Sequence, residues 1–217
     1  DANYISMRPL SVFRTDLEIV DIHCYFDGPQ PLAGWGAPLR CGHDDLVKDG
    51  GVHMPLYSIA GRLPGKPFMI TEFNIGYPNR YRSVCGPMVG ALSAFQAIDA
   101  VHRFDHIGVP LDKPGAIIWL SCGNDPVALL SDRLGAALFL RPDVRPADTA
   151  VPWLVTDACL DKPGALDWSH WYPDSYIAIG TSHRIGTVVL QGEETLPENT
   201  AGVLVSTEKV PAGRLGG

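Results

Sequence analysis

The chain has 217 residues, of which 46% are hydrophobic and 19% are charged, and its mean hydropathy is +0.05. This composition is typical of a globular protein and excludes the intrinsically disordered class. The formal net charge is −7 without a lysine or arginine run, so nucleic acid is not an expected partner. Apolar stretches fall far short of the roughly 20 residues of a membrane-spanning helix, so no membrane partner is expected either. Localisation and oligomeric state stay open.

Cysteine spacing argues against a disulfide framework or a zinc ribbon. The chain has five widely spaced cysteines and no C-x-x-C pair: Cys24, Cys41, Cys85, Cys122 and Cys159. The loop 41–45 and His53 contain ligand-type residues, but their spacing matches no zinc or calcium pattern. We therefore expect no metal site and no cofactor.

Strands and helices are expected to alternate up to about residue 140. In chain order we predict a strand over 17–25, a long loop to about 44, a helix over 55–60, a strand from Pro67 to Asn74, a helix over 87–98, a strand over 101–106, and a helix from Asn124-Asp125-Pro126 through Leu138. Beyond Arg145 the pattern changes to short β-rich runs at 176–179, 185–190 and 203–205. We therefore place a boundary near Pro146, with residues 1–146 in one domain and 147–217 in a β-rich accessory region.

Glu72 puts a carboxylate where an apolar strand ends. Phe68 to Ile70 form a buried-type run, and Thr71-Glu72-Phe73-Asn74 then turns polar. In a parallel α/β barrel the carboxyl end of each strand faces the active site. Such a position suits a catalytic base or nucleophile.

The surrounding motifs resemble those of a bacterial, cellulase-like group of clan A glycoside hydrolases. The motifs are Lys66-Pro67-Phe68, Thr71-Glu72-Phe73-Asn74, Pro78-Asn79 and the upstream Asp21-Ile22-His23-Cys24-Tyr25-Phe26-Asp27, and the likeness covers roughly residues 16–147. The resemblance implies a retaining O-glycoside hydrolase with Glu72 as nucleophile and a carbohydrate as substrate. It also implies an α/β fold, the C-terminal portion of a (β/α)8 TIM barrel, with segment 21–27 as the sixth strand.

A complete barrel needs about 250 residues, so the 72 residues up to Glu72 hold only about two strands. We therefore expect the first five strands to lie outside this chain. A retaining enzyme also needs a second carboxylate about 5–5.5 Å from the nucleophile. In the family this acid/base is a glutamate after an asparagine, and no Asn-Glu pair precedes Glu72. Glu18 lies in a strand-like alternation, so the acid/base is left unassigned and expected in the missing N-terminal part.

Five residues are predicted to bind substrate. His23 and Tyr25 share strand parity, so both point the same way and can hydrogen-bond a sugar or the Glu72 carboxylate. Asn74 lies two residues beyond Glu72, and Asn79 follows Pro78 in a turn-forming setting where asparagine is common for backbone reasons. Trp35 lies in a proline-glycine loop, where it either stacks on a sugar ring or anchors the loop.

Some positions depart from the family pattern. The segment 83–86 lacks the acidic residue that relatives carry, and Ile98 stands where they have tryptophan. The alternative is therefore a degenerate barrel protein that binds carbohydrate without cleaving it. In either case we expect no glycosidase turnover from the isolated chain.

Overall fold

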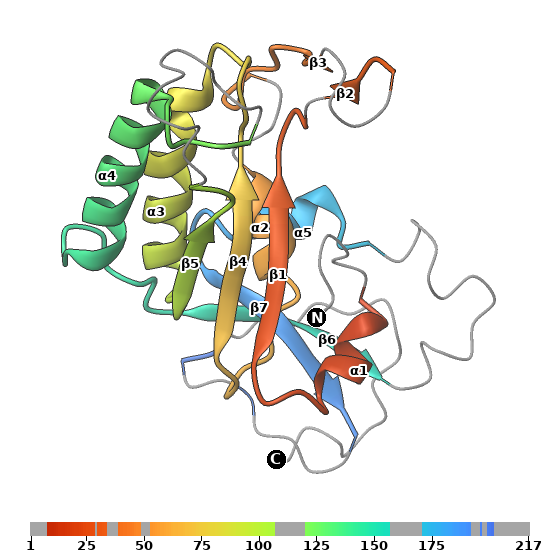
Figure 1. Ribbon diagram of the computed structural model, residues 1–217. Helices are drawn as coiled ribbons and strands as arrows, with labels where there is room; N and C mark the ends of the chain where they lie inside the picture. The colour runs from red at the N-terminus through yellow and green to blue at the C-terminus, as the bar shows by residue number, and fades with distance from the viewer. Residues whose placement is uncertain are drawn as a thin grey trace.

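The computed structural model describes residues 8–28, 30–33, 39–48, 53–106, 120–156, 171–191, 196 and 199–201. It is an α/β protein with parallel sheets, as the alternation of strand and helix patterns predicts (Figure 1). Among the described residues, no helix is long and apolar enough to cross a membrane.

The main sheet has three parallel strands in the order β1-β4-β5. The strands are β1 (Val20–Tyr25), β4 (Phe68–Asn74) and β5 (Ala100–Arg103). Helix α2 (Met54–Ile59) connects β1 to β4, and α3 (Cys85–Phe95) connects β4 to β5. The predicted strands and helices of this region are confirmed, with boundaries that differ by a few residues.

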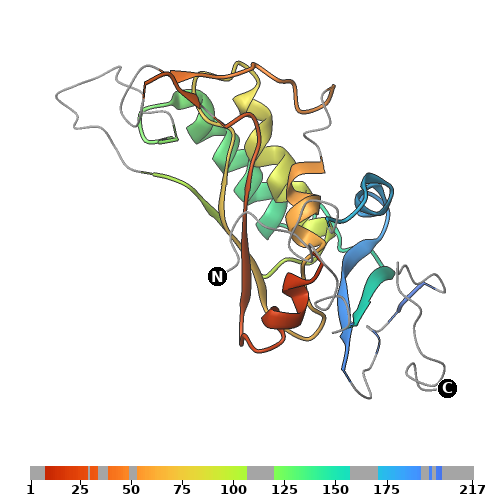
Figure 2. The same cartoon turned by 90° about the vertical axis from the view of Figure 1, so that its right-hand side faces the viewer.

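The apolar side chains of β1 and β4 point to one face of this sheet, because successive side chains of a strand point to opposite faces. This apolar face is covered by helices. Val20, Ile22, Phe68 and Ile70 are fully buried. Figure 2 shows α2, α3 and α4 on this one side of the sheet. The opposite face carries the polar side chains of the two strands.

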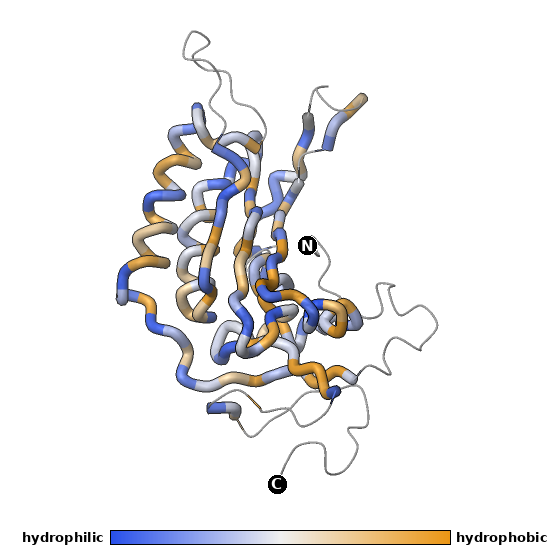
Figure 3. Tube along the Cα trace, turned by 60° about the horizontal axis from the view of Figure 1, so that its bottom comes forward, coloured by the Kyte–Doolittle hydropathy of each residue, from blue (hydrophilic) through white to orange (hydrophobic). Residues whose placement is uncertain are grey.

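Helix α4 (Pro126–Leu140) packs closely against α3. Its N-cap is Asp125, whose side chain accepts a hydrogen bond from the backbone N–H of Val127, and Pro126 occupies the first turn, as the sequence predicts. Apolar and polar residues alternate along α4, the helix on the left of Figure 3, and exposed leucines lie on it at Leu130, Leu134 and Leu140.

Smaller elements lie at both ends of the main sheet. The helix α1 (Leu10–Arg14) precedes β1, and the 3-10 helix η2 (Arg82–Val84) precedes α3. The antiparallel pair β2 (Gln30–Pro31) and β3 (Leu39–Arg40) lies above the carboxyl end of β1 in Figure 1. The Tyr77–Pro78 and Phe104–Asp105 peptide bonds are cis.

The region after residue 146 forms a β-α-β unit. Strands β6 (Ala150–Thr156) and β7 (Arg184–Leu190) are parallel, and α5 (Asp174–Ile179) lies between them in the chain. The predicted β run at 185–190 is confirmed. The run at 176–179 is wrong, because these residues belong to α5, and the run at 203–205 lies outside the described residues.

The error at 176–179 has a physical reason. Tyr176 is buried, and its hydroxyl bonds to the carbonyls of Val151 and Gly186, which ties the helix to β6 and β7. Tertiary contacts of this kind override the strand propensity of tyrosine and isoleucine. The division near Pro146 stays a prediction, and one hydrophobic cluster contains residues from both sides of it, including Ile22, Phe68, Trp153 and Ile177.

Candidate active site

A one-residue bulge at Thr71 turns Glu72 onto the open face of the sheet. The register of β4 against β1 shifts at this point, and Glu72 lies opposite His23. The β4 residues that lie in the hydrophobic core are Phe68, Ile70 and Phe73. The interval between inward-facing residues therefore changes from two to three. Strict alternation would have put Glu72 on the covered face, because a one-residue shift moves a side chain to the other side of a sheet.

Two side chains of β1 lie against one oxygen of the Glu72 carboxylate, and the Tyr25 hydroxyl is the one that donates a hydrogen bond to it. The Tyr25 hydroxyl donates a hydrogen bond of 2.6 Å to Glu72 Oε2, and His23 Nδ1 lies 3.1 Å from the same oxygen. His23 is 8% exposed and Glu72 is 25% exposed. Among the described residues, Glu72 Oε1 accepts no hydrogen bond. The geometry thus fixes one carboxylate oxygen and leaves the other on the open face.

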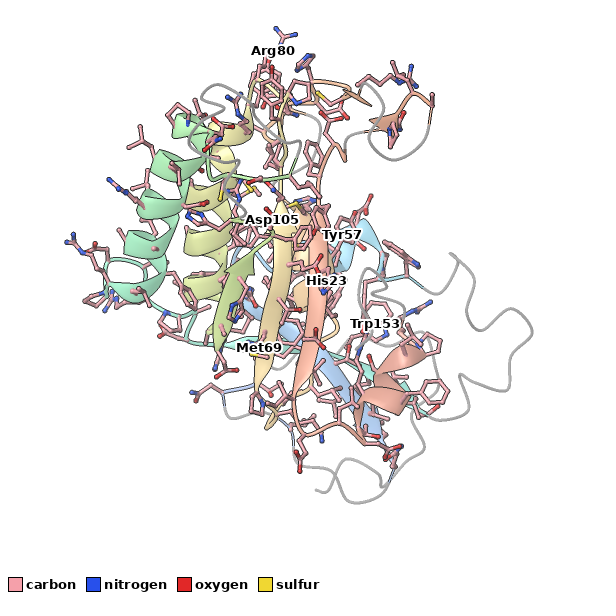
Figure 4. The ribbon with its side chains drawn as sticks, in the orientation of Figure 1. His23, Tyr57, Met69, Arg80, Asp105 and Trp153 are labelled. Atoms are coloured by element: carbon pink, nitrogen blue, oxygen red, sulfur yellow. The ribbon has the colours of Figure 1, made fainter. Side chains whose placement is uncertain are left out.

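The prediction that His23 and Tyr25 share a face is confirmed by these contacts. Val20, Ile22 and Cys24 alternate with them and lie in the core. Figure 4 shows His23 on β1 and Asp105 nearer the carboxyl end of the sheet. The site is therefore at the edge where the three parallel strands end.

Asn74 holds the chain that follows β5. Its side-chain amide donates to the carbonyls of Phe104 and Leu120, and its own carbonyl accepts a 2.7 Å hydrogen bond from Arg103. Arg103 also pairs with Asp132 of α4 at 2.6 Å. Asn74 is 1% exposed, so its amide is engaged within the protein. Direct contact with substrate at Asn74 stays a prediction.

Asn79 fastens two loops together above the sheet. It is fully buried, and its amide donates to Asp27 Oδ2 at 2.6 Å and to the carbonyl of Asp44 at 3.1 Å. Its side-chain carbonyl accepts from the backbone N–H of Tyr81. These contacts match the backbone role that its turn-forming sequence context indicates, and substrate binding by Asn79 stays a prediction. Trp35 lies outside the described residues.

Asp21 and Thr71 extend the polar face below Glu72, and sequence reasoning missed both. Thr71 donates a hydrogen bond of 2.7 Å to Asp21 Oδ2. The sequence contained a signal for Asp21, because the alternation that puts His23 and Tyr25 on one face also includes Asp21.

Glu18 is exposed and precedes the amino end of β1, so it lies at the opposite end of that strand from Tyr25 and the Glu72 site.

A cysteine-histidine pair lies just beyond β5. Cys122 Sγ is 3.2 Å from His106 Nδ1 and donates to the carbonyl of Asp105. Burial and then the charge of Asp132 raise the pKa of the Cys122 thiol to about 11, so it stays protonated at neutral pH. Among the described residues, no group of three or more histidine, cysteine, aspartate and glutamate side chains could hold a metal ion.

No protein-family model matches the chain, and neither a curated protein nor a solved structure matches it.

Proposed function

We propose that this chain carries the nucleophile side of a retaining O-glycoside hydrolase that acts on an oligosaccharide or polysaccharide. The observation that carries the proposal is the Glu72 carboxylate, whose Oε2 accepts a hydrogen bond from Tyr25 and lies 3.1 Å from His23 Nδ1, with Oε1 on an open face. Its place at the carboxyl edge of parallel strands supports the same function, because that edge bears the active site in α/β barrels.

The fold proposed for the whole site is a (β/α)8 barrel, of which β1, β4 and β5 are about strands 6 to 8. Three features support this proposal. The three strands are parallel, their order in the sheet follows their order in the chain, and α2, α3 and α4 lie on one face of the sheet. In a barrel the other face lines the interior, which agrees with the polar side chains found there.

The proposed reaction has two displacements. Glu72 Oε1 attacks the anomeric carbon, the glycosidic C–O bond breaks, and a second carboxylic acid gives its proton to the leaving oxygen. In the second displacement, water attacks the anomeric carbon of the glycosyl ester from the face opposite to Glu72 and gives a proton to the second carboxylate. The ester C–O bond breaks, which releases the Glu72 carboxylate and the sugar. The second carboxylate is not assigned in this chain, since Glu18 lies at the wrong end of the strands.

The Tyr25 hydroxyl orients Glu72 through its hydrogen bond to Oε2, and His23 lies beside the same oxygen. A hydrogen bond to a charged group contributes about 1.5–3 kcal/mol, so Tyr25→Phe is expected to lower kcat/KM by roughly tenfold to a hundredfold. The circular dichroism spectrum should remain that of the wild type.

The test uses the natural protein that contains these residues and a panel of 2-deoxy-2-fluoro glycoside inactivators. Peptide mass mapping should find a glycosyl adduct on the tryptic peptide 63–80, which contains Glu72. Glu72→Gln should abolish both the adduct and turnover. Glu18→Gln is the matched control, because it removes an exposed carboxylate at the other end of the sheet and should change neither.

Turnover that survives in Glu72→Gln would refute the assignment of the nucleophile. A protein that binds oligosaccharide but neither turns it over nor forms an adduct would instead favour the alternative, a carbohydrate-binding protein with a degenerate barrel.

A further inference from the structure

A cavity lies at the opposite edge of the main sheet from Glu72. This cavity of about 420 Å³ is formed by the turn before β4, the turn before β5, and the first residues of β6 and β7. Figure 3 brings this lower side of the molecule forward. Its polar lining includes Arg62, Lys66, Asp99, Arg184 and Asn199.

The charge of this lining is unbalanced. The lining contains three cationic side chains, Arg62, Lys66 and Arg184, and a single carboxylate, Asp99. The ammonium group of Lys66 donates a hydrogen bond of 2.6 Å to the carbonyl of Leu17. None of the four belongs to the ion pairs found among the described residues. The carboxylate of Asp99 instead accepts a hydrogen bond from the backbone N–H of Phe68 at 2.8 Å. The cavity therefore has an excess of positive charge that this part of the protein does not neutralise.

The two arginines differ in how many of their N–H groups have a hydrogen-bond partner. Arg62 donates to the backbone carbonyls of Gln96 and Ile185, which fix its guanidinium in the wall. The Nε–H of Arg184 is buried and has no hydrogen-bond partner among the described residues. A buried donor without an acceptor is costly, so this group favours a ligand that supplies an oxygen.

The arginines also repel each other. Burial, and then the positive charge of Arg184, lower the pKa of Arg62 to about 10. Two neighbouring guanidinium groups in a partly buried hollow are stabilised when an anion lies between them. Guanidinium groups suit oxyanions in particular, because their paired N–H donors match two oxygens of a carboxylate or phosphate.

We propose that this cavity binds the oxyanion group of a small molecule, either a phosphate or a carboxylate, between Arg62, Lys66 and Arg184. The hollow is larger than a bare oxyanion, so it has room for an organic part of the ligand. The site is separate from Glu72, since the two lie at opposite ends of β4, and its test requires no glycosidase activity.

The test measures binding of inorganic phosphate and of acetate to the natural protein containing these residues, at constant ionic strength with chloride as the replaced ion. Saturable chemical-shift changes of the backbone amides of β7 give a Kd for each probe. Tight binding of phosphate alone would identify a tetrahedral oxyanion site, and tight binding of acetate would identify a carboxylate site. Both results support the proposal.

The variant Arg184→Gln should weaken binding by about tenfold or more, because it removes a charged hydrogen-bond donor. Arg133→Gln is the control, since Arg133 is an exposed arginine on α4 and its loss should leave the Kd unchanged. Lys66→Gln gives an independent answer if Arg184→Gln does not fold. An unchanged Kd in folded Arg184→Gln and Lys66→Gln, or no saturable binding of either probe, would overturn the proposal.

Discussion

The contact between α3 and α4 makes a sharp prediction for Gly90. A Cβ added at Gly90 would lie 2.2 Å from the backbone carbonyl oxygen of Gly135. Gly86, one turn earlier on α3, is equally close to α4: a Cβ there would lie 2.1 Å from the carbonyl oxygen of Ser131. Real Cβ atoms essentially never come within 3.0 Å of such atoms, so Gly90→Ala must move the two helices apart.

Two effects of opposite sign decide the outcome. Replacing a mid-helix glycine by alanine stabilises a helix by about 1 kcal/mol. Overpacking costs about 1–3 kcal/mol or more, and the upper end applies because the obstructing atom is backbone and cannot rotate away. We therefore expect Gly90→Ala to lower the free energy of unfolding by about 2 kcal/mol net.

Urea unfolding followed by circular dichroism measures this change. Gly28→Ala is the control, because a Cβ there meets no heavy atom within 4 Å, and its effect should stay within about 0.5 kcal/mol. A Gly90→Ala protein as stable as the wild type, or more stable, would refute the close backbone contact between α3 and α4.

Two further predictions concern ionisable groups. Burial acts to raise the pKa of Asp125, but its hydrogen bonds and charge interaction with Arg82 outweigh this and leave the pKa below the ordinary value of 3.8. The resulting stabilisation is present above that value and is lost as the pH falls through the folded-state pKa. Asp125→Asn should thus lower the free energy of unfolding by about 3 kcal/mol at pH 7 and by less at pH 2. Urea unfolding at the two pH values measures both changes. An equal loss of stability at both pH values would contradict the ion pair. Burial raises the pKa of Cys24 and raises that of Cys85 to about 11, and it also raises the pKa of Cys41. Because Cys41 is partly exposed whereas Cys24 and Cys85 are buried, iodoacetamide at pH 8 should label Cys41 well before either. Early labelling of Cys85 would contradict the burial of its thiol at the start of α3.

Local patterns predicted the strands of the main sheet, the helices α2, α3 and α4, and β7, but they did not predict β6 or α5. The N-cap Asp125 with Pro126 begins α4 as expected, and the apolar run after Pro67 forms β4, because capping and alternation act between residues close in the chain. The run 176–179 failed because its conformation depends on Tyr176 reaching carbonyls of β6 and β7. Val151 and Gly186 lie 25 and 10 positions from Tyr176, outside the run itself, so the propensity of the run alone favoured a strand.

The candidate site divides in the same way. The alternation of residues in the sequence is enough to predict that His23 and Tyr25 share a face and that Glu72 lies near the carboxyl end of a strand. That Glu72 lies on the same face follows from strand pairing, because strict alternation places it with Phe68 and Ile70. The bulge at Thr71 becomes visible only when β4 is paired with β1. The same holds for Arg62 and Arg184, which are 122 positions apart and meet in one cavity. Side-chain periodicity is a property of one strand, whereas register and the meeting of distant charges are set by the packing of several elements.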